Sequence, residues 1–280
     1  MRAFGKTLTY SPGAAGLICT LALVSAFWLL TALNAPENSP LGPEEEVAIA
    51  SDDLPAPHRY IEVMHGCGPH FEGEQCVRSH AGPGEEYRVI NQLRKGVVLE
   101  VGGAMISESR IWFEIIFDEP IRYPERVARK QYVASEGGRL FLGNGVEHLD
   151  ETRPTTTKSV IVDRSLQMLY AFEDGHPYLE VPVSTGIQLT PTPRGTFTIF
   201  KKTPSRYMQG PIPDIISKYY DLPGVPWNLY FTHQGAVIHG AYWHDSFGRR
   251  WSSGCVNLPL AEAKKLYEWA DIGTTVIVRD

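Results

Sequence analysis

The sequence lacks any run or stripe of basic residues. Its 280 residues include 26 Lys and Arg against 32 Asp and Glu, so the formal net charge is −6. A nucleic-acid-binding protein presents clustered positive charge to the phosphate backbone. The composition therefore argues against nucleic acid as a partner, whereas 43% hydrophobic and 11% aromatic residues are typical of a folded globular protein.

Charged residues are absent from residues 13–35, and the stretch from Leu17 to Leu33 is almost wholly apolar. That length is close to what a helix needs to cross the hydrocarbon core of a bilayer. Residues 1–12 carry basic but no acidic side chains, which favours a cytoplasmic N-terminus. We expect a transmembrane anchor, with a cleaved signal segment as the alternative. In either case the remainder of the chain is exported.

Residues 36–57 have little that would build a hydrophobic core. They combine Pro36, Pro40, Pro43, Pro55 and Pro57 with the acidic runs 44–46 and 52–53. Proline and like charges keep such a segment extended. We expect an acidic, proline-rich linker that holds the folded part of the chain away from the membrane.

Cysteine is scarce, with four in the whole chain. Cys67 and Cys76 flank a short loop, and in an exported protein this spacing suggests a disulfide. A metal site that combines these cysteines with His65 or His70 is the alternative, and both the spacing and the compartment disfavour it.

Residues 58–146 and 157–280 are both predicted to be mainly β. The first region contains short β-branched or aromatic runs separated by Gly, Pro and Glu, at 60–63, 76–79, 87–90, 97–101, 112–116 and 132–134. The second region has similar runs at 159–163, 167–173, 178–184, 196–201, 229–232, 236–238 and 274–278. Its one clear helix is expected at 259–269, where apolar residues recur at helical spacing.

A histidine and a cysteine near the C-terminus are candidates for nucleophilic catalysis. His239 follows the apolar run 235–238, and Cys255 ends the sequence Ser252-Ser253-Gly254-Cys255. A thiol attacks as the thiolate and needs a base such as imidazole to accept its proton. The structural alternative is a buried cysteine beside a core histidine, since each residue type often serves that role.

The whole stretch resembles the signature of the L,D-transpeptidases (YkuD-type catalytic domain), bacterial enzymes that cross-link or anchor peptidoglycan through an acylated cysteine. The resemblance covers residues 157–280. It includes Ile238-His239-Gly240 and Ser252 to Leu258, and upstream the segments 161–163, 167–170, 174–175, 183–186, 192–197 and 224–227. The chain departs from the family at Ser253, where histidine is usual.

The resemblance implies a mechanism. Cys255 would be the nucleophile and His239 the general base and acid, oriented by the backbone carbonyl of Gly240. Backbone N–H groups at Gly254 and Cys255 would form the oxyanion hole. No metal and no organic cofactor is required. The donor would be a tetrapeptide stem that loses D-alanine, and the acceptor an amine of a second stem or of an anchored protein.

Further residues occupy family-like positions and are candidates for substrate binding. They are Tyr230, Trp243, His244, Arg249, Ser252, Ser253 and Asn257. Arg249 or Arg250 suits a stem-peptide carboxylate, and His244 is an alternative base. For each of them, packing or a solvated surface is the competing interpretation. An L,D-carboxypeptidase that uses water as the acceptor and a catalytically silent wall-binding module remain the functional alternatives.

The first β region also resembles a known module. The sequence over 77–79, 82–90 and 93–96 is similar to bacterial SH3-like domains, which bind wall peptides or act as spacers. The predicted architecture is thus mainly β: an N-terminal membrane anchor, a small SH3-like β-barrel at 58–146, and a β-sandwich-like catalytic domain with one helix at 157–280. We expect it in the cell envelope on the extracytoplasmic side, or in the periplasm if the segment is cleaved.

Overall fold

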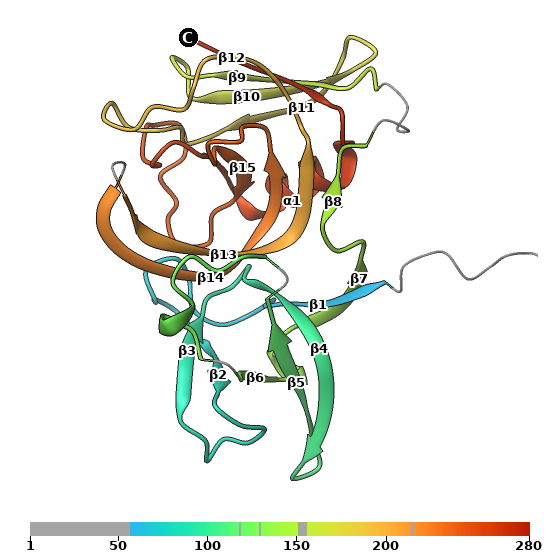
Figure 1. Cartoon of the computed structure of the whole chain (residues 1–280), viewed down its shortest axis with the longest axis vertical. Coiled ribbons are helices and arrows are strands. Elements are labelled where there is room, and N and C mark those ends of the chain that lie inside the picture. The colour runs from blue at the N-terminus through green and yellow to red at the C-terminus, as the bar shows by residue number, and fades with distance from the viewer. Residues whose placement is uncertain (1–56, 118, 129, 151–155, 214–215) are drawn as a thin grey trace, which may run out of the picture. The chain divides into compact units, whose positions relative to one another are not determined.

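The computed structural model describes residues 57–117, 119–128, 130–150, 156–213 and 216–280, all within one compact unit, Leu54–Asp280. This unit is mainly β, with three sheets and a single α-helix in the described part (Figure 1). The predicted anchor at 13–35 and almost all of the predicted linker at 36–57 lie outside the described residues. No helix in the described ranges is long and apolar enough to cross a membrane.

The N-terminal part forms an antiparallel sheet of seven strands in the order β3-β2-β6-β5-β4-β1-β7. The strands are β1 (His58–Glu62), β2 (Val77–His80), β3 (Val89–Leu93), β4 (Val98–Ser107), β5 (Arg110–Ile116), β6 (Tyr132–Ala134) and β7 (Arg139–Gly143). Two short 3-10 helices, η1 (Pro124–Arg126) and η2 (Ser135–Gly137), lie on either side of β6. Each run expected from sequence falls within or next to one of these strands.

Strand β1 joins the N-terminal sheet to the rest of the unit. Successive side chains of a strand point to opposite faces, and both Tyr60 and Ile61 are fully buried. Ile61 packs in a cluster with Leu93 and Val133 of the N-terminal sheet, whereas Tyr60 packs in the cluster that contains Leu229 of the C-terminal part. The two faces of one strand therefore serve two cores.

The C-terminal part consists of two five-stranded sheets and a helix. One sheet has the order β11 (His176–Pro182), β10 (Met168–Glu173), β9 (Ser159–Asp163), β17 (Thr275–Arg279), β12 (Gly195–Thr198). The other has the order β16 (Val256–Leu258), β15 (Val237–Gly240), β14 (Ile216–Tyr230), β13 (Lys201–Ile212), β8 (Glu147–His148). Helix α1 (Leu260–Trp269) follows Pro259 and buries Ala263, Leu266, Tyr267 and Trp269 against a core that includes β14 and β15.

The long hairpin of β13 and β14 is the main departure from the sequence expectation, which placed only short strands at 196–201 and 229–232. Its strands contain Pro204, Pro211, Pro223 and Pro226. Proline lacks an N–H and usually ends a ladder. Here the ladder continues through register shifts between Arg206 and Met208 and between Gly210 and Ile212. Pro223 and Pro211 lie at these irregular positions, whereas Pro226 pairs with Ser205 in register.

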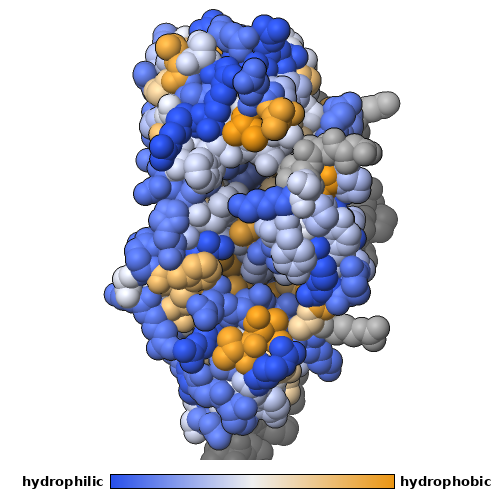
Figure 2. Space-filling view, turned by 90° about the vertical axis from the view of Figure 1, so that its left-hand side faces the viewer, coloured by the Kyte–Doolittle hydropathy of each residue, from blue (hydrophilic) through white to orange (hydrophobic). Residues whose placement is uncertain are grey.

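One face of the unit is mostly hydrophilic, with hydrophobic residues in small separate patches (Figure 2). Scattered apolar surface of this kind is ordinary for a folded protein in water.

Candidate active site

Two neighbouring parallel strands bring the predicted nucleophile and base into the same part of the fold. Strands β15 and β16 pair in parallel, with Ile238 opposite Val256 and His239 opposite Asn257. Cys255 immediately precedes β16, and β16 is the neighbour of β15, the strand that carries His239. Figure 1 shows β15 inside the C-terminal part, next to the β13–β14 hairpin.

His239 is almost completely buried, and its tautomer follows from one hydrogen bond. Its Nδ1 lies 3.0 Å from the carbonyl oxygen of Gly240. A carbonyl only accepts, so Nδ1 carries the proton and donates it, and Nε2 keeps its lone pair. Nε2 is buried and has no hydrogen-bond partner. Burial lowers the pKa of His239 to about 4, so the imidazole is neutral and Nε2 is available to accept a proton.

Cys255 is a free, half-buried thiol, and the only free cysteine in the described residues. Its Sγ lies 3.8 Å from the carbonyl oxygen of Gly235. Burial raises the pKa of the Cys255 thiol, and the positive charge of Arg206 opposes that effect. A thiol with a raised pKa beside a neutral imidazole needs that imidazole to take its proton during attack.

The backbone before Cys255 is held in a tight turn by Ser252. The Ser252 hydroxyl donates to the carbonyl oxygen of Cys255 at 2.5 Å and accepts from the N–H of Gly254 at 3.2 Å. Gly254 has φ of 116°, in the region that favours glycine, and a Cβ there would meet only Thr190 at 3.8 Å. Ser253 points to solvent and makes no hydrogen bond. Glycine is thus required at 254 for its backbone angle, while Ser252 fixes the turn.

Two upstream segments hold the nucleophile loop, which we define as residues 241–255. The backbone of Ser184 exchanges hydrogen bonds with Asn257 at 3.0 and 2.9 Å, and Thr185 accepts from the N–H groups of Trp251 and Ser252 at 3.0 and 3.1 Å. Thr192 bridges the N–H of Gly186 at 2.9 Å to the carbonyl oxygen of Cys255 at 3.4 Å. The segments 183–186 and 192–197, which carried part of the resemblance, therefore contact the loop that bears Cys255.

His244 uses both of its ring nitrogens inside the structure. Nδ1 accepts from the N–H of Ser246 at 3.1 Å, and Nε2 lies 2.8 Å from the side-chain amide of Asn257. A neutral imidazole has one N–H, so Nε2 donates and Asn257 must present its amide oxygen. Burial lowers the pKa of His244 to about 4. His244 thus has no free lone pair for proton transfer in this arrangement.

The remaining predicted residues lie in three different settings. Tyr230 is buried, donates to Glu119 at 3.4 Å and has its pKa raised by burial. Trp243 packs its ring against His239, with 5.6 Å between centroids. Arg249 donates to the Ser246 hydroxyl at 3.0 Å, so part of its guanidinium is already engaged.

Arg206 is the residue that the sequence did not reveal. It lies in β13, within the proline-containing stretch that was not expected to be a strand. Its charge lowers the pKa of both Cys255 and His239, and its guanidinium lies over the Tyr230 ring, 5.2 Å from the centroid. No spacing relative to Cys255 signals this residue, because only the curled hairpin brings it to the site.

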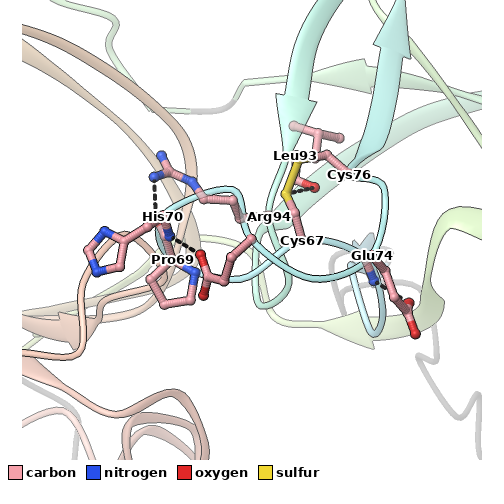
Figure 3. Close-up of a disulfide and its surroundings, with 9 residues drawn as sticks. Cys67, Pro69, His70, Glu74, Cys76, Leu93 and Arg94 are labelled. Carbon is pink, nitrogen blue, oxygen red and sulfur yellow. Dashed lines mark hydrogen bonds between the residues drawn. A yellow bond between two sulfur atoms is a disulfide. The ribbon is translucent and has the colours of Figure 1, made fainter.

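Cys67 and Cys76 are joined by a disulfide that closes residues 67–76, which we call the disulfide loop (Figure 3). Arg94 donates to the carbonyl oxygen of Pro69 at 3.0 Å, and Figure 3 shows its side chain extended along the loop. The same guanidinium lies 4.5 Å from the ring centroid of Phe71 and 5.0 Å from that of Tyr242. Arg94 therefore connects the disulfide loop to the nucleophile loop.

A cavity of about 400 Å³ opens beside this connection, and neither His239 nor Cys255 lines it. Its walls are Phe71, Ile90, Asn91, Gln92, Arg94, Val97, Asp221, Pro223 and Tyr242. Among the described residues, no group of three or more His, Cys, Asp or Glu side chains is placed to hold a metal ion.

The C-terminal part of the chain matches a known protein family. Residues 157–278 match the model of the YkuD family, described as the L,D-transpeptidase catalytic domain. No curated protein matches the chain.

Similar solved structures include an L,D-transpeptidase from Mycobacterium smegmatis, 22% identical, with 64% of this chain and 93% of that chain covered and a TM-score of 0.42. L,D-transpeptidase 3 from Mycobacterium tuberculosis is 21% identical, with 64% and 93% covered and a TM-score of 0.41. A mutant of the Enterococcus faecium L,D-transpeptidase is 27% identical, with 44% and 50% covered and a TM-score of 0.40. TM-scores this low support no argument, so the assignment rests on the match over residues 157–278.

Proposed function

We propose that this protein, whose residues 157–278 match the model of the YkuD L,D-transpeptidase catalytic domain, is a cysteine-dependent acyltransferase acting on peptidoglycan stem peptides. The observation that carries the proposal is the state of His239. Its Nδ1 is tied to the Gly240 carbonyl oxygen at 3.0 Å, and its buried Nε2 is unpaired. His239 lies on β15, and β15 pairs with β16, the strand that begins directly after the free Cys255. A neutral imidazole in this position fits thiol activation.

In the first half-reaction, the Cys255 thiol attacks the carbonyl carbon at the L-centre of the diamino acid in a tetrapeptide stem. His239 Nε2 takes the thiol proton as the C–S bond forms. The resulting tetrahedral intermediate collapses with cleavage of the C–N bond, and the imidazolium returns the proton to the departing amine of D-alanine. The products are a thioester on Cys255 and free D-alanine, and His239 is neutral again.

The oxyanion of the intermediate requires donors near Cys255. In the present arrangement the N–H of Gly254 donates to the Ser252 hydroxyl at 3.2 Å. That contact is long for a hydrogen bond to oxygen and would be exchanged for the substrate oxygen. The N–H of Cys255 itself is the second donor in the proposal.

In the second half-reaction, an amine of another stem, or of an anchored protein, attacks the thioester, and His239 removes the proton from the amine. The acceptor then forms an amide bond and Cys255 regains its thiol. Water as the acceptor would make the enzyme an L,D-carboxypeptidase. We also propose that the N-terminal sheet is an SH3-like module for wall peptides or spacing. Residues 13–35 would tether the protein on the extracytoplasmic side of the membrane.

The full-length protein incubated with a disaccharide-tetrapeptide tests this function by mass spectrometry. Cross-linked dimers that have lost D-alanine support transpeptidation, and shortened monomers alone point to water as the acceptor. Cys255→Ala should abolish D-alanine release and covalent labelling by a carbapenem. Labelling that persists at another residue in this variant would contradict the assignment of Cys255.

A further inference from the structure

Arg206 is a half-buried cation without an acidic partner in the described ranges. Its Nη1 is enclosed and makes no hydrogen bond, and no acidic side chain in the described ranges pairs with it. Its neighbours on the same hairpin differ. Lys201 pairs with Glu119 at 2.7 Å, and Asp221 of β14 pairs with Arg126 at 2.8 Å.

An enclosed polar atom without a partner costs free energy, and the cost is larger for a charged group. Such an atom in a folded protein calls for an explanation, and a role in binding an anionic ligand is one. A guanidinium that lacks a carboxylate in the resting protein is suited to bind one, because its planar N–H groups match the geometry of a carboxylate.

The surroundings of Arg206 place its charge within electrostatic reach of the Cys255 thiol. Its guanidinium lies over the ring of Tyr230, 5.2 Å from the centroid. Its charge acts on Cys255, on His239 and on Tyr220, and Cys255 in turn acts on both tyrosines. Arg206 thus contacts Tyr230, and its charge reaches Cys255, His239 and Tyr220. An anion bound by this guanidinium would lie in the same part of the site as the nucleophile.

We propose that Arg206 binds the α-carboxylate of the leaving amino acid of the donor stem. This inference rests on the proposed function and adds a specificity determinant to it. In a stem that ends at the leaving residue, the terminal carboxylate is three bonds, roughly 4 Å, from the carbonyl carbon that Cys255 attacks. In a stem with a further residue, the carbon of that carboxylate is instead part of a neutral amide. Arg206 therefore selects donors whose scissile bond is the last peptide bond.

The competing role for Arg206 is stabilisation of the thiolate without substrate contact. The two roles predict different results for two donors, a disaccharide-tetrapeptide ending in D-alanine and the same compound ending in D-alaninamide. Carboxylate binding makes the loss in an Arg206 variant specific for the acid. Thiolate stabilisation lowers acylation by both donors equally and slows alkylation of Cys255 by iodoacetamide near neutral pH.

The experiment measures kcat/KM for release of the terminal residue from both donors by the wild-type protein, Arg206→Gln, Arg206→Lys and Lys218→Gln. Arg206→Gln should lose about 10- to 100-fold on the acid, as expected for a charge-assisted hydrogen bond. The loss on the amide should be at least about tenfold smaller, because only the effect of the charge on Cys255 remains there. Arg206→Lys should recover part of the loss. Lys218, an exposed cation on the same hairpin, controls for general loss of positive charge and should behave as the wild type.

A binding measurement separates this inference from the proposed function. In a Cys255→Ala background, the acid-ended stem should bind more tightly than the amide-ended stem, and adding Arg206→Gln should remove the difference. If the wild-type protein releases no D-alanine but this preference is present, the proposed function fails and the carboxylate site stands. Equal losses on both donors, or a preference for the acid that survives Arg206→Gln, would overturn the assignment of Arg206.

Discussion

The disulfide loop and the nucleophile loop solve the same problem in different ways. Residues 67–76 are closed by a covalent bond between Cys67 and Cys76. Residues 241–255 end in a free cysteine, whose thiol must stay free in the proposed function. They are held by hydrogen bonds from Ser184, Thr185 and Ser252.

The difference shows what a reactive cysteine costs a loop. A disulfide restricts the unfolded chain and needs little support from its surroundings. A loop with a free thiol is instead held by separate hydrogen bonds between buried polar groups. Removing one partner of such a bond lowers the stability of the protein. The histidines show the consequence. Both ring nitrogens of His244 are paired, with Ser246 and Asn257, whereas His239 keeps one unpaired nitrogen. That nitrogen is the one that the proposed chemistry needs.

Removal of His239 should have the largest effect on the nucleophile loop's function. His239→Ala should lower kcat/KM for D-alanine release by about 10²- to 10⁴-fold, since a general base is lost. The loss should be greater if the thiolate no longer forms. Steady-state kinetics with the disaccharide-tetrapeptide measure this effect, and circular dichroism controls for folding. A loss below tenfold would show that another group takes the thiol proton.

Acidic pH should lower the free energy of unfolding through His239, next to the nucleophile loop, rather than through the disulfide loop. Burial lowers the pKa of His239 to about 4, whereas an unfolded histidine titrates near 6.5. The unfolded chain therefore binds more protons between these values, and the free energy of unfolding rises with pH across that window. One such histidine contributes about 3 kcal/mol.

Urea unfolding between pH 4 and pH 7 checks the predicted pH dependence. The stability should be lost as the pH falls from 6.5 to 4, and His239→Gln should show a shallower slope. An identical slope in the variant would mean that His239 is not the group responsible.

Opening the disulfide should destabilise the protein by about 2–3 kcal/mol, the contribution expected for a loop of this length. The double variant Cys67→Ala/Cys76→Ala should lose that much free energy of unfolding, while iodoacetamide still labels Cys255. Thiol mapping of the denatured, unreduced protein by peptide mass spectrometry should find Cys255 reactive and Cys67 and Cys76 blocked. Three reactive thiols after residue 57 would contradict the disulfide.

Two adjacent serines provide the smallest and sharpest contrast within the nucleophile loop. Ser252→Ala removes two hydrogen bonds of the turn and should cost about 1–3 kcal/mol in stability, with a clear fall in D-alanine release. Ser253→Ala, at an exposed position without hydrogen bonds, should change stability by less than about 0.5 kcal/mol.

Ser253 is also where the chain departs from the usual histidine of the family. Ser253→His should be tolerated, since the side chain at 253 points to solvent. If Ser253→Ala cost as much activity as His239→Ala, the division of roles between these two positions would be wrong.

The sequence alone specified the local features of this protein. Alternating β-branched residues predicted the strand Ser159–Asp163 with its observed bounds, and apolar residues at helical spacing predicted the helix Leu260–Trp269 to within one residue. These predictions succeed because period-2 and period-3.6 patterns reflect which side chains must face a core. The order of the motifs also pointed to the catalytic family before any distance was known.

Only the tertiary structure decided which groups meet. The tautomer of His239 depends on a carbonyl direction, and the engagement of both His244 nitrogens depends on the position of Asn257. Arg206 reaches the site because the hairpin of β13 and β14 continues through register shifts despite its prolines. From the sequence, prolines in this stretch favour a loop over a strand. Long-range packing, which no local pattern encodes, sets these contacts, and they determine where a lone pair or a charge remains unpaired.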